Sequence, residues 1–186
     1  MPIEPTDIDG LLVVSWVPHP DERGFFRQTY QLTELEAALG RPVVFRQGNH
    51  ARSRPGVLRG FHAEPWDKLV YVSRGDVLAA VADIRPDSPT FGEVRTFRLG
   101  DADPARRRLY LTTGLANSYA VVGTSDADYL YDATAEWSPT SPRVTVAWND
   151  PDLGVDWPVG DPVLSAADRA NRTLRQQFPD HPRWQR

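Results

Sequence analysis

Proline and glycine interrupt this chain so often that it can form only short elements. The 186 residues include seventeen prolines and thirteen glycines. Between them lie short segments rich in Val, Leu, Tyr and Phe, which are typical of β-strands. These segments are 11–17, 24–30, 43–47, 69–72, 77–84, 94–99, 108–111, 118–122, 127–131 and 144–148. Many short strands at such spacing predict a β-sandwich or barrel.

Two helices are expected among the strands. Thr33-Glu34-Leu35-Glu36 has the form of a capping box, and Gly40 is placed to end the helix that follows. A second helix should begin at Ser165 and run towards Phe178. No repeat, linker or low-complexity segment divides the chain. Residues 1–186 are therefore expected to form a single domain.

The composition restricts the classes of function. The chain has no cysteine, which excludes disulfides, thiolate catalysis and cysteine-ligated zinc. A net charge of −4 and a pI near 5.5 argue against nucleic acid as the main partner. The first four residues lack the basic and apolar character of a signal peptide, and no apolar run approaches the roughly 18 residues of a membrane helix. We therefore expect a soluble cytoplasmic protein with no membrane partner.

The segment Gly56–Lys68 has the most concentrated candidate chemistry. It places a histidine, two cations and two carboxylates within thirteen residues. In an alternating strand, Arg59 would lie on one face, and Gly60, His62 and Glu64 would lie on the other. Such a pattern suits a base beside cations that hold an anionic substrate. The alternative is a half-buried strand histidine with surface charges around it.

A metal site is not expected in this chain. The run His62-x-Glu64 offers a single imidazole, and Asn117 stands in a later loop where a further histidine would be needed. One imidazole is too few for a typical transition-metal site. The protein is therefore predicted to be metal-free.

Two further features each allow a structural and a functional interpretation. Tyr129 and Tyr131 fall on one strand face, where they could pack in the core, act as a general acid or form an aromatic wall. Asp168 is the fourth residue of Ser165-x-x-Asp168, which has the form of a helix cap. The same carboxylate could instead orient an imidazole. Spacing alone leaves these alternatives open.

Several longer motifs resemble dTDP-4-dehydrorhamnose 3,5-epimerases and occur in the order found in that family. They are Asp21–Phe26, Gln47–His50, Gly56–His62, Asp83–Arg85, Ser88–Gly92 and Asp150–Pro158. The resemblance covers about residues 8–170. It implies a mainly β, cupin-type sandwich or jelly-roll barrel with a few short helices, usually assembled as a homodimer.

The resemblance also implies a reaction. Family members epimerise C3 and C5 of a dTDP-4-keto-6-deoxyhexose without a cofactor, as in dTDP-rhamnose and related deoxysugar biosynthesis. The 4-keto group acidifies the protons at C3 and C5, so that a base can remove one and an acid can return one to the opposite face. By position, His62 matches the base, Asp168 the carboxylate that orients it, and Tyr131 the acid. Lys68 matches a cation near the developing enolate oxygen.

The family's substrate pocket is matched at eight further positions. They are Arg23, Phe26, Gln28, Gln47, Asn49, Arg59, Asn117 and Trp137, with the arginines serving the diphosphate. Three of them depart from the usual pattern: Asn117 replaces a histidine, Gln28 a glutamate and Trp137 a tyrosine. These departures leave two alternatives open, an epimerase of one carbon (C3 or C5) in a natural-product pathway, and a non-catalytic sugar-nucleotide-binding protein.

Overall fold

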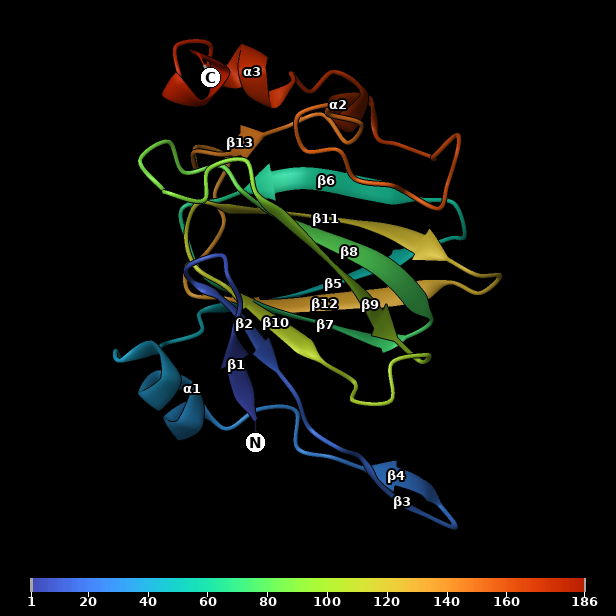
Figure 1. Ribbon diagram of the computed structural model, residues 1–186. Coiled ribbons are helices and arrows are strands. Elements are labelled where there is room, and N and C mark those ends of the chain that lie inside the picture. The colour runs from blue at the N-terminus through green and yellow to red at the C-terminus, as the bar shows by residue number, and fades with distance from the viewer. Residues whose placement is uncertain (1, 186) are drawn as a thin grey trace.

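The computed structural model describes residues 2–185, which form two packed antiparallel sheets (Figure 1). The strands are β1 (Ile3–Pro5), β2 (Leu11–Val14), β3 (His19–Asp21), β4 (Gly24–Phe26), β5 (Gln47–Ser53), β6 (Leu58–Ala63), β7 (Lys68–Arg74), β8 (Asp76–Asp83), β9 (Val94–Gly100), β10 (Arg108–Leu111), β11 (Leu115–Val122), β12 (Ala127–Ala133) and β13 (Val144–Thr145). One sheet has the order β1-β2-β10-β7-β12-β5, the other β13-β6-β11-β8-β9, and β3 pairs with β4. The predicted mainly β sandwich is confirmed.

The main core lies between the two sheets. Val70 and Val72 of β7 are buried in one cluster with Val77, Ala79 and Val81 of β8. These residues are two apart in each strand, so they point to the same face of their sheet. Packing of the two inner faces explains why the predicted strand segments are rich in β-branched residues.

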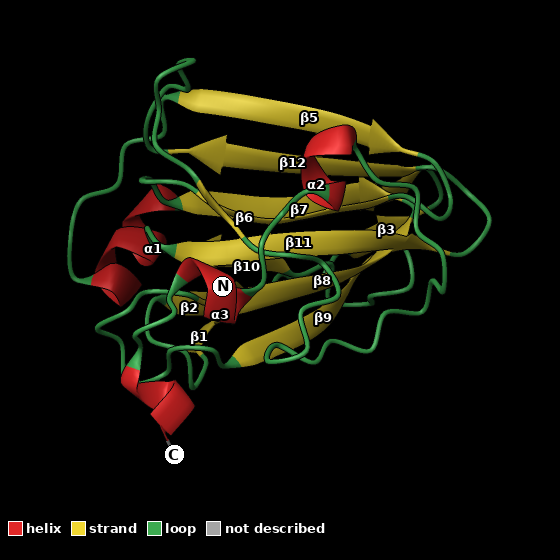
Figure 2. Cartoon of the chain, turned by 90° about the horizontal axis from the view of Figure 1, so that it is seen from above, coloured by secondary structure: helices red, strands yellow, loops and turns green. Residues whose placement is uncertain are grey.

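The outer face of each sheet is partly covered by other parts of the chain. Helix α1 (Leu32–Leu39) packs Leu35 against Leu69 and Tyr110 on the six-stranded sheet. The C-terminal segment, red in Figure 1, packs Leu174 against Phe61 on the five-stranded sheet. Seen from above, α2 (Ala166–Arg169) and α3 (Leu174–Gln177) lie over the strands (Figure 2). A short 3-10 helix, η1 (Pro182–Gln185), follows them.

The first helix forms as predicted, but its expected cap was wrong. Gly40 ends α1 in the left-handed conformation, with a φ of 66°. The N-cap is Gln31, which makes no side-chain cap, so the sequence Thr33–Glu36 lies inside the helix. The carboxylate of Glu36 instead accepts a hydrogen bond from the backbone N–H of Val43 at 3.0 Å.

The second predicted helix is two separate helices. Ser165 caps α2 by accepting a hydrogen bond from the N–H of Asp168, as expected. The chain leaves helical geometry at Ala170, and Thr173 then caps α3 with a capping box of its own. The prediction of one continuous helix from Ser165 towards Phe178 was therefore wrong, because the helix is interrupted between Ala170 and Thr173.

The segment before β5 also differs from its prediction. Residues 42–46 form no strand, and Val43 packs in the cluster under α1 instead. The strand begins at Gln47 and carries mostly polar side chains, so the search for apolar segments did not predict it. The predicted segment 24–30 is a strand only over Gly24–Phe26.

An irregularity in β6 changes which of its side chains share a face. Strand β11 pairs Asn117 with His62 but Tyr119 with Arg59, so one residue of β11 lies opposite two residues of β6. Such a bulge reverses the alternation of side chains. Arg59 and His62 therefore line the same cavity, and the expected separation of Arg59 from His62 was wrong. The expected shared face of His62 and Glu64 agrees with the structure.

Within residues 2–185, no helix is both long enough and apolar enough to cross a membrane.

Candidate active site

A cavity of about 150 Å³ lies between the two sheets and is lined by chemically active side chains. Its walls are formed by Ala51, Arg59, His62, Glu64, Lys68, Asn117, Tyr119, Tyr129 and Tyr131. A second pocket of about 380 Å³, between β6 and α2, shares Arg59 and His62 with this cavity and adds Asp168. Because strands of both sheets contribute, folding of the sandwich assembles the site. His62 lies where the two pockets meet.

The imidazole of His62 is held by Asp168 of α2. The Nε2 atom of His62 lies 2.6 Å from Oδ1 of Asp168. A carboxylate can only accept, so Nε2 carries the proton and Nδ1 holds the lone pair of the neutral ring. Asp168 also serves the cap, because its N–H donates to Oγ of Ser165 at 3.0 Å. Both interpretations of Asp168 thus agree with the structure.

Asp168 is buried, yet it remains a carboxylate. Burial acts to raise its pKa, but hydrogen bonds from His62, Ser165 and Asn171 outweigh that effect and leave the pKa lowered. The Oγ of Ser165 donates to Oδ2 of Asp168 at 2.9 Å. A fixed negative charge at this place can stabilise the imidazolium that forms when His62 accepts a proton.

Lys68 is the single lysine of a chain that contains twenty arginines, and it is buried in the cavity. Its Nζ donates to Oδ1 of Asn117 at 2.5 Å and forms an ion pair with Glu64. Burial lowers the pKa of Lys68, and the carboxylate of Glu64 acts in the opposite direction. An ammonium group here can stabilise negative charge that develops on a bound carbonyl oxygen.

The two tyrosines on the inner face of β12 have different surroundings. Tyr129 is buried, accepts a hydrogen bond from Nδ2 of Asn117 at 3.3 Å, and stacks on Tyr119 with ring centroids 4.0 Å apart. The hydroxyl of Tyr131 has no hydrogen-bond partner within residues 2–185. Burial, with the nearby carboxylate of Glu64, raises the pKa of Tyr131. Its phenol is therefore protonated at neutral pH and can donate a proton.

Gln47 and Asn49 lie on the same face of β5 as Ala51, which lines the cavity. Nε2 of Gln47 donates to Oδ1 of Asn49 at 2.8 Å, and Oε1 of Gln47 accepts from the N–H of Trp137 at 2.8 Å. The Nδ2 of Asn49 is buried and has no partner among the described residues. Buried polar atoms are rarely left unpaired, so this amide is available to a ligand.

Arg59 lines both pockets and is held by one of its nitrogens. Its Nε donates to Oγ of Ser53 at 3.0 Å, and that oxygen lies 3.0 Å from the hydroxyl of Tyr119. The guanidinium also interacts with the hydroxyl of Tyr119, and as a cation beside the cavity it can bind an anion. Trp137 is exposed and lines a neighbouring pocket of about 300 Å³ together with Glu64 and Trp66.

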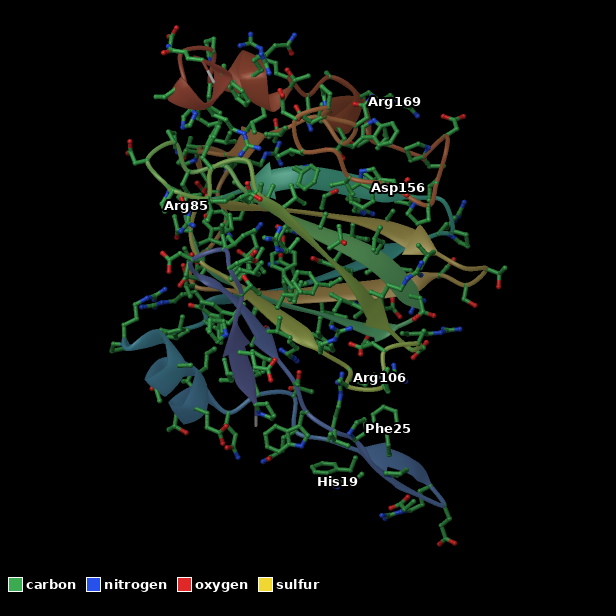
Figure 3. The ribbon with its side chains drawn as sticks, viewed as in Figure 1. His19, Phe25, Arg85, Arg106, Asp156 and Arg169 are labelled. Carbon is green, nitrogen blue, oxygen red and sulfur yellow. The ribbon has the colours of Figure 1, made fainter. Side chains whose placement is uncertain are left out.

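Three predicted substrate-binding residues lie outside this assembly. Arg23 and Phe26 belong to the β3–β4 hairpin, which projects from the sandwich (Figure 1) and is marked by Phe25 in Figure 3. The side chain of Arg23 is 84% exposed and, among residues 2–185, pairs only with Asp21, while Phe26 is 70% exposed. Gln28 is exposed next to the hairpin. A single chain therefore does not bring these residues to His62.

The structure adds site residues that the sequence analysis did not propose. Glu64 and Tyr119 line the cavity, and Ser53 holds Arg59. The sequence contained a signal for Glu64, because it alternates with His62 and precedes the only lysine by four positions. Among residues 2–185, no group of three or more His, Cys, Asp or Glu side chains could hold a metal ion.

Comparison with known proteins identifies the family. The model of the dTDP-4-dehydrorhamnose 3,5-epimerase family matches residues 5–176. The chain is 40% identical over 158 residues to a dTDP-4-dehydrorhamnose 3,5-epimerase of Pseudomonas aeruginosa, covering 83% of this chain and 85% of that relative. It is 33% identical over 173 residues to a dTDP-4-dehydrorhamnose 3-epimerase of Streptomyces niveus, covering 91% and 82%.

A solved structure agrees with these relatives. A 4-keto-6-deoxy sugar epimerase from the novobiocin biosynthetic gene cluster of Streptomyces spheroides superimposes with a TM-score of 0.90. The two proteins are 31% identical, and the match covers 96% of this chain and 90% of the other. Fold, site and sequence lead to one conclusion: this chain belongs to the dTDP-4-dehydrorhamnose 3,5-epimerase family.

Proposed function

We propose that this chain epimerises C3 and C5 of a dTDP-4-keto-6-deoxyhexose, without a cofactor, in dTDP-L-rhamnose or related deoxysugar biosynthesis. The observation that carries the proposal is the 2.6 Å pair of His62 and Asp168 beside a cavity that also holds Lys68 and Tyr131. This set supplies a base, a charge that supports it, a cation and an acid. Membership of an epimerase family supports the same conclusion.

The positions of the acid and the base suit inversion of a carbon. His62 belongs to β6 of the five-stranded sheet and Tyr131 to β12 of the six-stranded sheet. A sugar ring between the sheets would meet the base on one face and the phenol on the other. Nδ1 of His62 removes the proton next to the ketone, and the electron pair moves onto the carbonyl oxygen near Lys68. Tyr131 then returns a proton from the opposite face.

We infer that the working protein is a homodimer in which the partner's β3–β4 hairpin completes the pocket. The projecting hairpin exposes Phe25 and Phe26, and Val17 before it is also exposed. Such apolar side chains on a projecting ribbon are typical of a protein interface. This arrangement would bring Arg23, which matches a phosphate-binding position of the family, to the pocket of the partner chain. We place the dimer in the cytoplasm and assign it no metal, nucleic-acid or membrane partner.

Proton exchange tests the proposed reaction directly. In deuterium oxide, proton NMR of dTDP-4-keto-6-deoxyglucose with the protein should show loss of both the H3 and the H5 signals. His62→Ala should slow the exchange by about 100-fold or more, because general base catalysis contributes that much. His181→Ala is a matched control, since His181 belongs to the C-terminal segment and contacts Pro86 and Phe91 of the loop between β8 and β9. Full exchange by His62→Ala would refute the assignment of the base.

The same spectra separate the alternatives. Loss of only one signal would identify a single-carbon epimerase, a possibility favoured by the relative named as a 3-epimerase. Asn117 and Trp137 would then be the first residues to examine, because they depart from the usual family pattern. Binding of dTDP without any exchange would indicate a sugar-nucleotide-binding protein.

A further inference from the structure

The ion pair of Glu64 and Lys68 is unusual because both of its members lie inside the cavity. The side chain of Lys68 is 5% exposed and that of Glu64 is 13% exposed. Removing an ammonium group from water favours its neutral form unless a negative group lies close by. Nothing in the reaction as proposed above makes use of Glu64.

The other groups around Lys68 do not supply a negative charge. The polar and charged groups that line the same cavity or face the ammonium are Arg59 and the imidazole and carbonyl of His62 on β6, Asn117 and Tyr119 of β11, Tyr129 and Tyr131 of β12, and Arg143 just before β13. Two of these groups are cations, and Arg143 acts to lower the pKa of Lys68. Asp168 is engaged by His62 and Ser165 on the other side of β6. Glu64 is therefore the carboxylate available to Lys68.

The contacts of Nζ also define its direction. Besides Glu64, the ammonium contacts Oδ1 of Asn117 at 2.5 Å and the carbonyl of His62 at 3.4 Å. The ammonium therefore makes one ion pair and two hydrogen bonds. The long contact to the His62 carbonyl is the one that an enolate oxygen can replace at least cost.

We propose that Glu64 is a positioning residue that keeps Lys68 charged and directed into the cavity, so that Lys68 can stabilise the enolate. This inference rests on the proposed function and extends it to a residue that does not itself touch the reacting carbons. It makes the epimerase dependent on a carboxylate that never exchanges a proton with the sugar.

The single lysine makes a direct test possible. Protein labelled with ¹³C- and ¹⁵N-lysine will give one side-chain signal set, which reports the charge of Lys68 without any need for activity. In Glu64→Gln this signal should titrate at lower pH than in the natural protein. Glu64→Asp keeps a carboxylate, so its lysine signal should titrate between those of Glu64→Gln and the natural protein. Glu4 is an exposed glutamate of β1, and Glu4→Gln should leave the titration of Lys68 unchanged. Identical titration of Glu64→Gln and the natural protein would overturn the proposal.

Kinetics provide the second readout. Activity that needs the ammonium form is lost as pH rises through the pKa of Lys68. The alkaline limb of the kcat profile should therefore move to lower pH in Glu64→Gln, with kcat reduced about tenfold or more at pH 8. A kcat profile of Glu64→Gln that matches the natural protein would also overturn the proposal. Absence of exchange in the natural protein would instead refute the proposed function, while the lysine titration would still test the pairing.

Discussion

At the scale of single residues, the site depends on pairs that spacing cannot reveal. His62 and Asp168 are separated by 106 positions, and the structure joins them by one hydrogen bond. Their partnership was available from sequence only through the family resemblance. Asp168 serves both the cap of α2 and the imidazole, so the two interpretations of its motif were never exclusive. Alternation placed Glu64 on the face of His62, but nothing in the sequence assigned it a role beside Lys68.

Replacing Asp168 by Asn tests its role towards His62. The amide keeps the size of the side chain but removes the charge that stabilises an imidazolium. We expect kcat to fall by about 100-fold or more, while KM changes little. Steady-state kinetics would measure both. Asp152→Asn removes a carboxylate that pairs with Arg175 away from the cavity, and it should retain natural kinetics. A fall in kcat of the same size in both variants would point to a general structural effect.

At the scale of elements, the apolar segments predicted most of the strands. The predictions failed where a strand carries polar side chains or where its backbone has a bulge. The strand β5 carries Gln47 and Asn49 on its inner face because that face borders the pocket, so it lacks the apolar pattern of a core strand. The bulge in β6 could not be expected from alternation, yet it places Arg59 beside His62. Departures from the strand pattern thus coincide with the site.

Gly60 allows the bulge in β6, and replacing it tests this idea. Its φ is 126°, and an added Cβ would lie 2.5 Å from Cβ of Ser118. Gly60→Ala should lower the free energy of unfolding by about 3 kcal/mol or more, from backbone strain and overpacking together. Gly56→Ala is the matched control, because φ is 79° there but no atom lies within 4 Å of the added Cβ.

Urea unfolding of both glycine variants would measure the difference. Gly56→Ala should cost only about 1–2 kcal/mol, because its strain is confined to the backbone. Equal losses in the two variants would show that the contact with Ser118 contributes nothing to the requirement for glycine.

At the scale of the whole molecule, one chain brings together the proposed catalytic residues but not all of the proposed substrate-binding residues. The resemblance covers both groups of residues, and only the structure separates them. His62, Lys68 and Tyr131 line one cavity, whereas Arg23 projects into solvent on the hairpin. A sequence lists residues along one chain and contains no information on which copy each one serves. The division between cavity and hairpin is what makes the proposed homodimer testable.

Mixed dimers would show which copy uses Arg23. Arg23→Ala and His62→Ala should each be poorly active alone. In a heterodimer, however, one site would keep its own His62 and receive an intact Arg23 from the partner. Co-expression of the two variants with different tags, followed by purification on both tags, should therefore recover up to about half of the natural activity per dimer. His62→Ala combined with Lys68→Met should recover none, because both residues lie in one cavity of the same chain. No recovery with Arg23→Ala would mean that Arg23 serves its own chain, and full activity of Arg23→Ala alone would mean that Arg23 serves no site.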